Sequence, residues 1–284
     1  MRSSPAVEIP SSRPMTGAET DLSIVRDLVR EAGGRVMELL LSPLVTSRKA
    51  DHSLVTNADH AANDLLCAGL RRRFPGYGVL SEETGLEGPP GAEFLWVIDP
   101  LDGTRAYAKG LPGFSVMVGL LRNGQPEAGV VYDPMTETLF EAARGQGTFR
   151  WRGRVRTPLR VSDRREWGAM PVITSRGFPP ALRLALEKSG GLRFLEPINS
   201  VGIKVGYLVD GRADLYLNHH PVHLWDTCAP LVILEEAGGR MTHWDGTPLS
   251  YVLDGRYAHS QATVATNGPR HDDLIALLPG LART

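Results

Sequence analysis

Trp96-Val-Ile-Asp-Pro-Leu-Asp-Gly-Thr-Arg105 is an apolar run that ends in an acidic turn. Its first residues have the composition of a buried strand, which would deliver Asp99 at its end. The proline that follows fixes the next backbone angle, and Gly103 allows a sharp turn. Because Asp99 and Asp102 lie three residues apart on a rigid turn, their carboxylates can point at a common centre. The segment predicts a strand that leads into a candidate active-site loop.

A strand-rich stretch surrounds this turn. Short apolar runs bounded by turn residues occupy residues 77–80, 94–98, 115–121, 128–132 and 138–142. The Asn123-Gly124 pair between two of these runs is a strong hairpin signal. Helical periodicity marks two earlier segments, residues 20–41 and 59–74. We therefore expect an antiparallel meander with two helices on one face.

The second half of the chain, after about residue 162, alternates between strand-like and helical segments. Strands are expected at residues 172–174 and 213–217, and helices at residues 180–188, 200–209 and 226–237. This alternation is typical of a layered α/β arrangement. The sequence thus predicts an α/β protein whose N-terminal half is α+β. We expect a disordered tail rich in Ser and Pro over residues 1–17, a metal-binding catalytic domain over 18–162 and an α/β substrate-binding domain over 163–284.

The composition excludes several classes of protein. The chain has 284 residues, with 31 Lys plus Arg against 32 Asp plus Glu, which gives a formal net charge of −1. This balance argues against a nucleic acid polymer or a membrane as a partner held by bulk charge. Two cysteines are too few for a disulfide scaffold or a four-cysteine zinc site. No apolar stretch reaches the ~18 residues of a membrane span. We expect a cytoplasmic protein, and the sequence allows a homodimer.

Further acids stand at the expected ends of other elements. Glu82 and Glu83 follow a strand-like run, and Asp226 opens a helix after two large apolar residues. Taken singly, each acid is also typical of a turn, a helix cap or a solvated loop. Carboxylates gathered at one centre would repel one another unless a cation lay between them. Oxygen ligands without cysteine or paired histidine favour Mg²⁺ over Zn²⁺.

Three ordered motifs resemble the inositol monophosphatase family. One is the Asp-Pro-Leu-Asp-Gly-Thr turn at residues 99–104. The others are Leu224-Trp-Asp-Thr-Cys-Ala-Pro230, followed by Glu236-Ala-Gly-Gly239, and Lys-Ala-Asp-His-Ser-Leu-Val-Thr-Asn-Ala-Asp at residues 49–59. The resemblance covers nearly the whole chain. It implies a layered αβαβα sandwich and Mg²⁺-dependent hydrolysis of a phosphate monoester that lithium inhibits.

The resemblance also implies roles for individual residues. The ligands of two or three Mg²⁺ ions would be Glu82, Asp99, the carbonyl of Leu101, Asp102 and Asp226. The catalytic residues would be Asp59, Thr104 and Glu82, with Asp59 and Thr104 positioning the attacking water. Backbone N–H groups of Gly103 and Thr104 could bind the phosphate if a helix starts there. Glu83 would lie behind the ligands or face solvent.

Within this family the sequence leans towards the CysQ-type 3′(2′),5′-bisphosphate nucleotidases. The motif at residues 49–59 has the form of that subgroup, and Arg105 follows the acidic turn as it does there. Ser200-Val-Gly-Ile-Lys204 resembles the subgroup's nucleotide-binding turn, so Lys204 would hold a second phosphate. The alternative for Lys204 is an exposed lysine of a helix. Ser175-Arg-Gly-Phe178 departs from the subgroup's Ser-Arg-Ser-His, and Phe178 would stack on a base or pack in the core.

Three histidines of the second half, His219, His220 and His223, are candidates for the site. Inositol monophosphatases place a glutamate seven residues before the aspartate of Trp-Asp, and that position here is His219, which weakens an inositol substrate. We expect His219-His220-x-x-His223 to be a loop with at most one histidine facing the site, because consecutive strand residues point to opposite faces. The residues expected to bind substrate are Gly103, Thr104, Arg105, Ser200, Lys204, His219 and Asp226.

The leading interpretation is hydrolysis of 3′-phosphoadenosine 5′-phosphate to AMP and phosphate by a metal-activated water. An inositol-1-phosphate phosphatase and a histidinol-phosphate phosphatase are alternatives within the same family. Two alternatives belong to other functional classes: a non-catalytic phosphate-binding or regulatory protein on the same fold, and a two-metal nuclease, which also uses clustered carboxylates. The full set of expected ligands, together with Thr104 and Asp59, argues against the first of these, and the near-neutral charge argues against the second.

Overall fold

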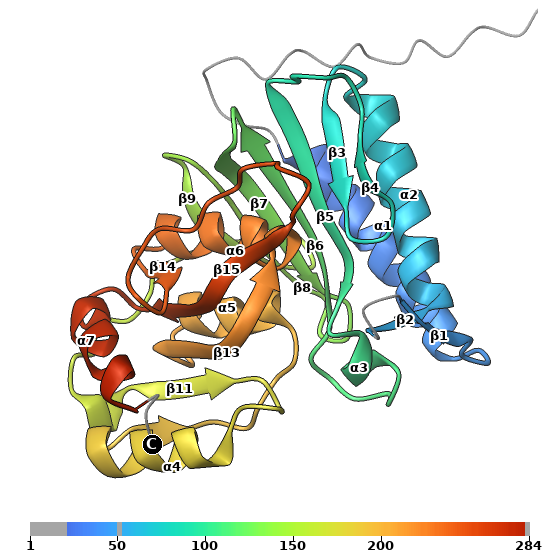
Figure 1. Cartoon of the computed structure of the whole chain (residues 1–284). Coiled ribbons are helices and arrows are strands. Elements are labelled where there is room, and N and C mark those ends of the chain that lie inside the picture. Colours follow the sequence, from blue (N-terminus) through green and yellow to red (C-terminus); the bar gives the residue numbers. More distant parts are fainter. Residues whose placement is uncertain (1–21, 50–52, 282–284) are drawn as a thin grey trace, which may run out of the picture.

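The computed structural model describes residues 22–49 and 53–281. The predicted tail at residues 1–17 lies outside these residues. The described chain is layered: a helix pair, a sheet, a second helix pair, a second sheet and a third helix pair (Figure 1). This αβαβα sandwich confirms the predicted fold class.

The larger sheet carries the acidic turn. Its strands run in the order β10-β9-β8-β7-β6-β5-β3-β4. They are β3 (Gly78–Ser81), β4 (Gly85–Glu87), β5 (Phe94–Asp102), β6 (Ser115–Arg122), β7 (Gln125–Asp133), β8 (Thr138–Ala143), β9 (Gly147–Arg152) and β10 (Val155–Leu159). The run from β5 to β8 is the predicted antiparallel meander, and the unpredicted strands β9 and β10 continue it. The strand expected at residues 77–80 is β3, but it joins β5 in parallel and so is not part of the meander. Asn123-Gly124 forms the two-residue β6–β7 turn with positive φ at both residues, as its composition predicts.

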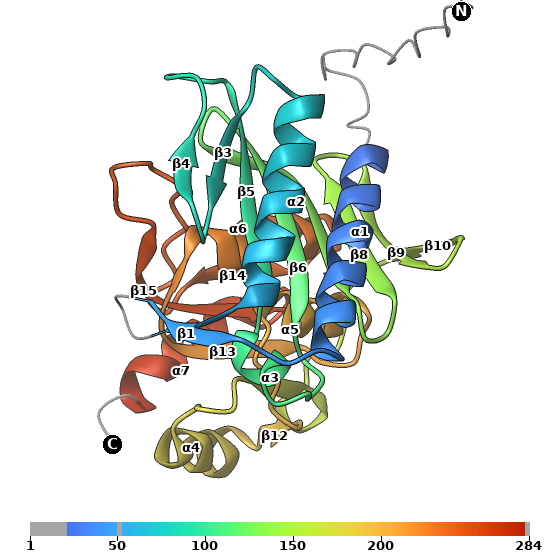
Figure 2. The same cartoon turned by 90° about the vertical axis from the view of Figure 1, so that its right-hand side faces the viewer.

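Two helices, α1 (Ser23–Leu40) and α2 (Asn57–Arg73), cover one face of this sheet, as predicted (Figure 2). Their apolar side chains bury against strand residues such as Trp96 and Val118. A short hairpin of β1 (Thr46–Arg48) and β2 (Leu54–Thr56) leads from α1 to α2. It places Lys49 and Thr56 at the end of the sheet where β5 turns.

Helices α5 (Val201–Val209) and α6 (Leu224–Glu236) form the middle layer between the two sheets. Helix α6 lies very close to the larger sheet because Gly129 in β7 has no side chain. A Cβ atom at Gly129 would lie 2.4 Å from the carbonyl oxygen of Ala229. The first turn of α6 thereby comes beside the end of β5.

The smaller sheet has the strand order β12-β11-β13-β15-β14. Its strands are β11 (Pro171–Thr174), β12 (Arg193–Phe194), β13 (Leu215–His223), β14 (Arg240–His243) and β15 (Ala258–Thr266). Helices α4 (Pro180–Gly190) and α7 (His271–Leu281) pack on its outer face. The boundary expected near residue 162 lies between the two sheets, and the division into two domains stays a prediction. No helix in the described part of the chain combines the length and apolarity needed to cross a bilayer.

Several elements were not predicted from the sequence. They are β1, β2, β4, β9, β10, β12, β14, β15, α7 and the one-turn helices α3 (Thr104–Tyr107) and η1 (Trp167–Ala169). Strand β13 also differs from the expected 213–217, because it continues through the histidines to His223. The expected loop of histidines is therefore wrong, and these residues belong to a strand that pairs with β15.

Candidate metal centre and catalytic pocket

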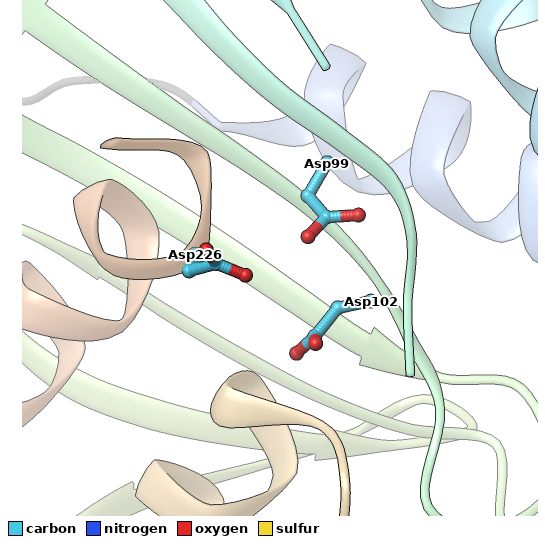
Figure 3. A group of neighbouring side chains, drawn as sticks. All are labelled: Asp99, Asp102 and Asp226. Atoms are coloured by element: carbon cyan, nitrogen blue, oxygen red, sulfur yellow. The ribbon is translucent and has the colours of Figure 1, made fainter. Parts of the chain in front are cut away.

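Three aspartates converge where β5 ends beside α6 (Figure 3). Single carboxylate oxygens of Asp99, Asp102 and Asp226 all lie within 4.8 Å of one another. In a regular strand, residues three apart point to opposite faces. Here Asp99 pairs with Met117 whereas Asp102 pairs with Ser115, so β5 contains one extra residue between the two aspartates. This bulge turns both carboxylates towards α6.

The electrostatics of the cluster demand a counter-charge. Burial raises the pKa of Asp99 well above its usual range, and the charges of Glu82, Asp102 and Asp226 raise it further. Burial and the Asp226 charge likewise raise the pKa of Asp102 to about 6. Within the described residues no lysine or arginine forms an ion pair with Asp99. Three such carboxylates fit a divalent cation, and the charge of that cation would keep the carboxylates ionised.

Asp102 is oriented by the start of helix α5. Its Oδ2 accepts hydrogen bonds from the Ser200 hydroxyl at 2.7 Å and from the backbone N–H of Gly202 at 3.0 Å. Ser200 also caps α5, since its Oγ accepts the N–H of Ile203. These contacts fix one oxygen of Asp102 and leave the other for the cluster. Ser200 thus turns its hydroxyl to Asp102, and the predicted contact of Ser200 with substrate stays a prediction.

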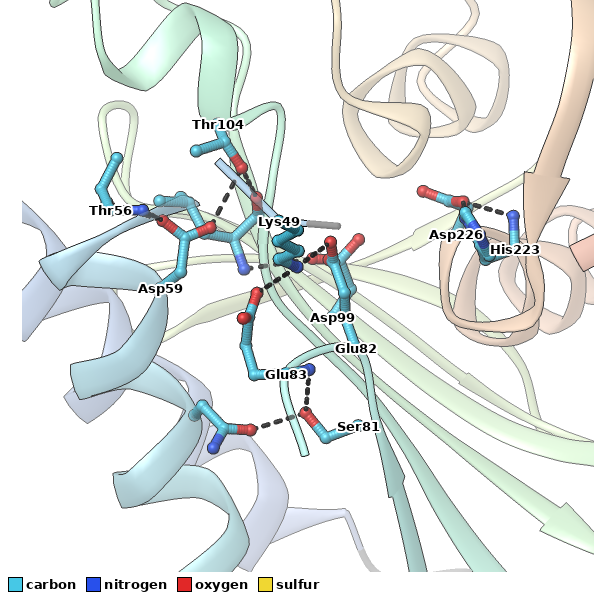
Figure 4. A network of polar contacts seen from close by, with 12 residues as sticks. Lys49, Thr56, Asp59, Ser81, Glu82, Glu83, Asp99, Thr104, His223 and Asp226 are labelled. Carbon is cyan, nitrogen blue, oxygen red and sulfur yellow. Dashed lines mark hydrogen bonds and ion pairs between the residues drawn. The ribbon is translucent and has the colours of Figure 1, made fainter. Parts of the chain in front are cut away.

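Asp226 lies in the first turn of α6. Its Oδ2 accepts the backbone N–H of His223 at 2.6 Å, so the carboxylate also caps the helix (Figure 4). The His223 ring stacks on Trp225 with 4.6 Å between ring centroids. Asp226 can therefore cap the helix with one carboxylate oxygen and bind a metal with the other.

Glu82 lies next to the aspartate cluster and pairs with a lysine. The Lys49 ammonium donates to Glu82 at 2.7 Å and to Glu83 at 2.6 Å (Figure 4). Burial raises the pKa of Glu82 to about 7, although Lys49 opposes this effect. Burial alone would lower the pKa of Lys49, but the two glutamates raise it above its ordinary value. The Glu83 side chain is only 4% exposed, so Glu83 lies behind Glu82 and does not face solvent. Lys49 has a place in the site that sequence reasoning missed.

Thr104 and Asp59 meet beside this cluster. Thr104 Oγ1 lies 3.0 Å from Asp59 Oδ1 and 3.0 Å from the Leu101 carbonyl oxygen. The other Asp59 oxygen accepts the N–H and the hydroxyl of Thr56, which caps α2. Burial raises the pKa of Asp59, and its hydrogen bonds to Thr56 and Thr104 oppose that rise. The structure brings the two residues together, and their role towards water stays a prediction.

A helix begins directly after the acidic turn. Gly103 has a φ of 93°, and α3 starts at Thr104. A Cβ atom at Gly103 would lie 2.5 Å from the Gly113 carbonyl oxygen, so glycine is required on steric grounds as well. Phosphate binding by the N–H groups of Gly103 and Thr104 is expected only if a helix starts at this point. The structure meets this condition, and the binding itself stays a prediction.

A pocket of about 580 Å³ opens above these groups. Its lining includes Glu82, Asp102, Thr104, Arg105, Ser175, Asn199, His219, His220, His223 and Asp226. All three histidines line it, so the expectation of at most one facing histidine is wrong. Burial lowers the pKa of His219.

Lys204 lies behind this pocket and is fully buried. Its ammonium donates to Ser175 Oγ at 2.6 Å and to the Asn199 carbonyl at 3.1 Å, and both residues line the pocket. Burial lowers the pKa of Lys204 to about 8, while the charges of Asp102 and Asp226 oppose the shift. The alternative of an exposed helix lysine is wrong. Phe178 packs in the core between the smaller sheet and α4.

The centre fits Mg²⁺ by the chemistry of its donors. The grouped side chains offer carboxylate oxygens, which a hard divalent cation prefers. The expected number of two or three ions stays a prediction. Glu82 and the Leu101 carbonyl, the other expected ligands, border the same turn.

Comparison with known proteins agrees with the fold. The sequence profile of the inositol monophosphatase family matches residues 18–279. The 3′(2′),5′-bisphosphate nucleotidase CysQ of Escherichia coli (strain K12) is 34% identical over 242 residues, which are 81% of this chain and 93% of that protein. An inositol-1-monophosphatase of Mesorhizobium japonicum is 34% identical over 209 residues, 72% of this chain and 77% of that protein.

A solved structure has the same fold. The inositol monophosphatase from Anabaena (Nostoc) aligns with a TM-score of 0.74 and 32% identity, over 91% of this chain and 95% of that one. Fold, acidic centre and sequence thus lead to one conclusion. The chain belongs to the inositol monophosphatase family of metal-dependent phosphatases and is a phosphoric monoester hydrolase.

Proposed function

We propose that this hydrolase acts on 3′(2′),5′-bisphosphate nucleotides and converts 3′-phosphoadenosine 5′-phosphate to AMP and phosphate. The observation that carries this choice is the Lys204 ammonium behind the pocket, which donates to Ser175 Oγ. Because Lys204 uses an acceptor position of that hydroxyl, the Ser175 O–H can donate into the pocket. A second phosphate is the substrate group that suits a donor polarised by a buried cation. The similarity to the Escherichia coli nucleotidase supports the same choice.

We assign the metal to Asp99, Asp102 and Asp226, together with Glu82 and the Leu101 carbonyl. Mg²⁺ bound there would neutralise charge on the phosphate and activate a water. The carboxylates hold it in a site where burial strengthens every ionic contact. Within this arrangement, Lys49 balances the charge of Glu82 and opposes the rise in the pKa of that carboxyl group.

Thr104 and Asp59 position the attacking water in this proposal. The Thr104 hydroxyl donates to Asp59, so its oxygen is free to accept a hydrogen from water. That contact would direct a lone pair of the water at phosphorus. Thr56 holds Asp59 in place through two hydrogen bonds. The N–H groups of Gly103 and Thr104 would hold the oxygens of the phosphate that is cleaved.

The test is phosphate release from a panel of esters. The panel contains 3′-phosphoadenosine 5′-phosphate, inositol 1-phosphate and histidinol phosphate, each measured with excess Mg²⁺. The variant Lys204→Met keeps the side-chain volume and removes the charge. We expect it to raise KM for the nucleotide about tenfold, since a charged hydrogen bond contributes ~1.5–3 kcal/mol, and to affect inositol 1-phosphate less. Equal kinetics on both substrates, or no effect of the variant, would assign the enzyme to inositol-type phosphatases instead.

A further inference from the structure

Strand β13 leaves its regular pairing where it passes the catalytic pocket. Leu217 pairs with Val264 and Pro221 pairs with Ala262. Three residues, 218 to 220, therefore lie opposite Thr263 alone. A bulge of this kind bends the strand and changes which way its side chains point.

Asn218 holds the bulge through both ends of its amide. Its Oδ1 accepts the backbone N–H of His219 at 2.8 Å, and its Nδ2 donates to the backbone carbonyl of His220 at 2.9 Å. The Asn218 side chain is buried, with 1% of the residue exposed. Backbone groups that lose their strand partners at the bulge thus find partners in one buried side chain.

Two consecutive imidazoles face the same pocket as a result. A regular strand would send His219 and His220 to opposite faces. Here both line the catalytic pocket, with 4.7 Å between their ring centroids and an interplanar angle of 77°. The His219 ring also packs at right angles to Phe178, with 5.8 Å between the ring centroids and an interplanar angle of 86°.

The chemistry of this pair suits the organic part of a substrate. His220 Nδ1 lies 2.9 Å from the Pro221 carbonyl oxygen, so in the neutral ring that nitrogen carries the hydrogen. Its Nε2 is then an acceptor, which a hydroxyl or an amino group can satisfy. Aromatic rings also offer flat surfaces to a base or a sugar ring.

We propose that Asn218 is a positioning residue, which sets His219 and His220 as the wall that recognises the alcohol portion of the phosphate ester. This inference rests on the proposed phosphatase pocket. It does not depend on the alcohol being a nucleoside. Asn218 touches no substrate in this scheme and acts through the two histidines.

The test compares a large and a small ester. Values of kcat/KM are measured for 3′-phosphoadenosine 5′-phosphate and for methyl phosphate, whose alcohol is too small to reach the wall. We expect His219→Ala, His220→Ala and Asn218→Ala each to reduce the ratio of the two values about three- to tenfold, as for the loss of a neutral hydrogen bond. The loss should lie in KM of the large ester. Asn218→Asp keeps the acceptor for the His219 N–H and should restore part of the ratio.

A double-mutant cycle separates positioning from a general structural role. Asn218→Ala added to the His219→Ala, His220→Ala pair should change the ratio less than twofold if Asn218 acts through them. Additive losses, or equal losses on both esters, would overturn the proposal. Asn267 is the matched control, since it is another buried asparagine, with its amide held by Ser162 and the Arg164 carbonyl. Asn267→Ala should lower stability and leave the ratio within twofold.

The outcomes also separate this inference from the choice of substrate. If the unmodified enzyme prefers inositol 1-phosphate, the proposed nucleotide is wrong, and the same cycle is run with that ester. If Asn218→Ala does not fold, the cycle is run with Asn218→Asp. A ratio unchanged by that variant while both histidine variants reduce it overturns the positioning role.

Discussion

Replacing Asp102 by asparagine should stabilise the metal-free protein and make its stability less dependent on pH. Asp102 is 7% exposed and sits within 4.8 Å of two other carboxylates. Asparagine is the same shape, and its carbonyl oxygen can still accept from Ser200 and Gly202. Only the charge is lost, so the variant measures what that charge costs the apo fold.

The magnitude follows from the pKa of Asp102. Burial, and then the Asp226 charge, raise it from 3.8 to about 6. At ~1.4 kcal/mol for each unit, the ionised group costs the folded protein about 3 kcal/mol. Below about pH 4 the group is protonated in both states and there is no penalty. As pH rises towards about 6, the unfolded chain releases its proton first, so the free energy of unfolding falls, and above that pH the penalty is complete.

Urea denaturation followed by tryptophan fluorescence in EDTA tests this reasoning. At about pH 7.5 Asp102→Asn should be more stable than the unmodified protein by about 1–3 kcal/mol, and at about pH 4 the difference should vanish. Saturating Mg²⁺ should cancel or reverse this difference, because a ligand at ~100 times its Kd adds about 2.7 kcal/mol to the protein that binds it. A variant that is less stable at neutral pH, or a difference independent of pH, would refute the electrostatic account of the centre.

Three further changes probe the water, the metal and the packing. Thr104→Ala should lower kcat by about 10²–10⁴-fold in a phosphate-release assay, while Thr104→Ser keeps most activity; equal losses would make Thr104 a packing residue. Asp99→Asn should nearly abolish turnover with an unchanged circular dichroism spectrum, and lithium should inhibit the unmodified enzyme; full activity at saturating Mg²⁺ would contradict the ligand assignment. Gly34→Ala, which meets open space, should raise the free energy of unfolding by ~0.5–1 kcal/mol. Gly33→Ala should lower it by about 1–3 kcal/mol, because its Cβ would lie 2.5 Å from a Tyr132 ring carbon; stabilisation by both would refute that contact.

Local signals in the sequence were enough for the first half of the fold. The β6–β7 hairpin follows from Asn123-Gly124, whose positive φ angles match the twist of the strands. Helices α1 and α2 follow from apolar spacing. Strand β15 could not be predicted in this way, because Ala258–Thr266 is built largely of small and polar residues. It forms a strand because it lies between β13 and β14 and pairs with both, although its own composition does not favour a strand.

The same distinction between local signals and distant contacts applies to the site. The sequence indicated the acids because each stands at the end of an element. It could not indicate how the chain orients them, since those contacts join distant residues. The bond from Ser200 to Asp102 spans 98 positions, and the bond from Lys49 to Glu82 spans 33. The predicted loop of histidines failed for a related reason: Pro221 and two histidines disfavour a strand locally, yet pairing with β15 and the Asn218 amide hold them in one.

The geometry of the centre depends on the middle helical layer as well as on the larger sheet. Two of the clustered aspartates come from β5, but Asp226 comes from α6, and Asp102 is held by the start of α5. Both helices are packed closely on the larger sheet at glycine contacts. A Cβ at Gly202 would lie 2.6 Å from the Met117 sulfur, and Gly129 meets Ala229 as closely. A shift of either helix by the width of a methyl group would separate the carboxylates that a cation must bridge. The small residues of this layer are therefore as necessary to the metal centre as the acids themselves.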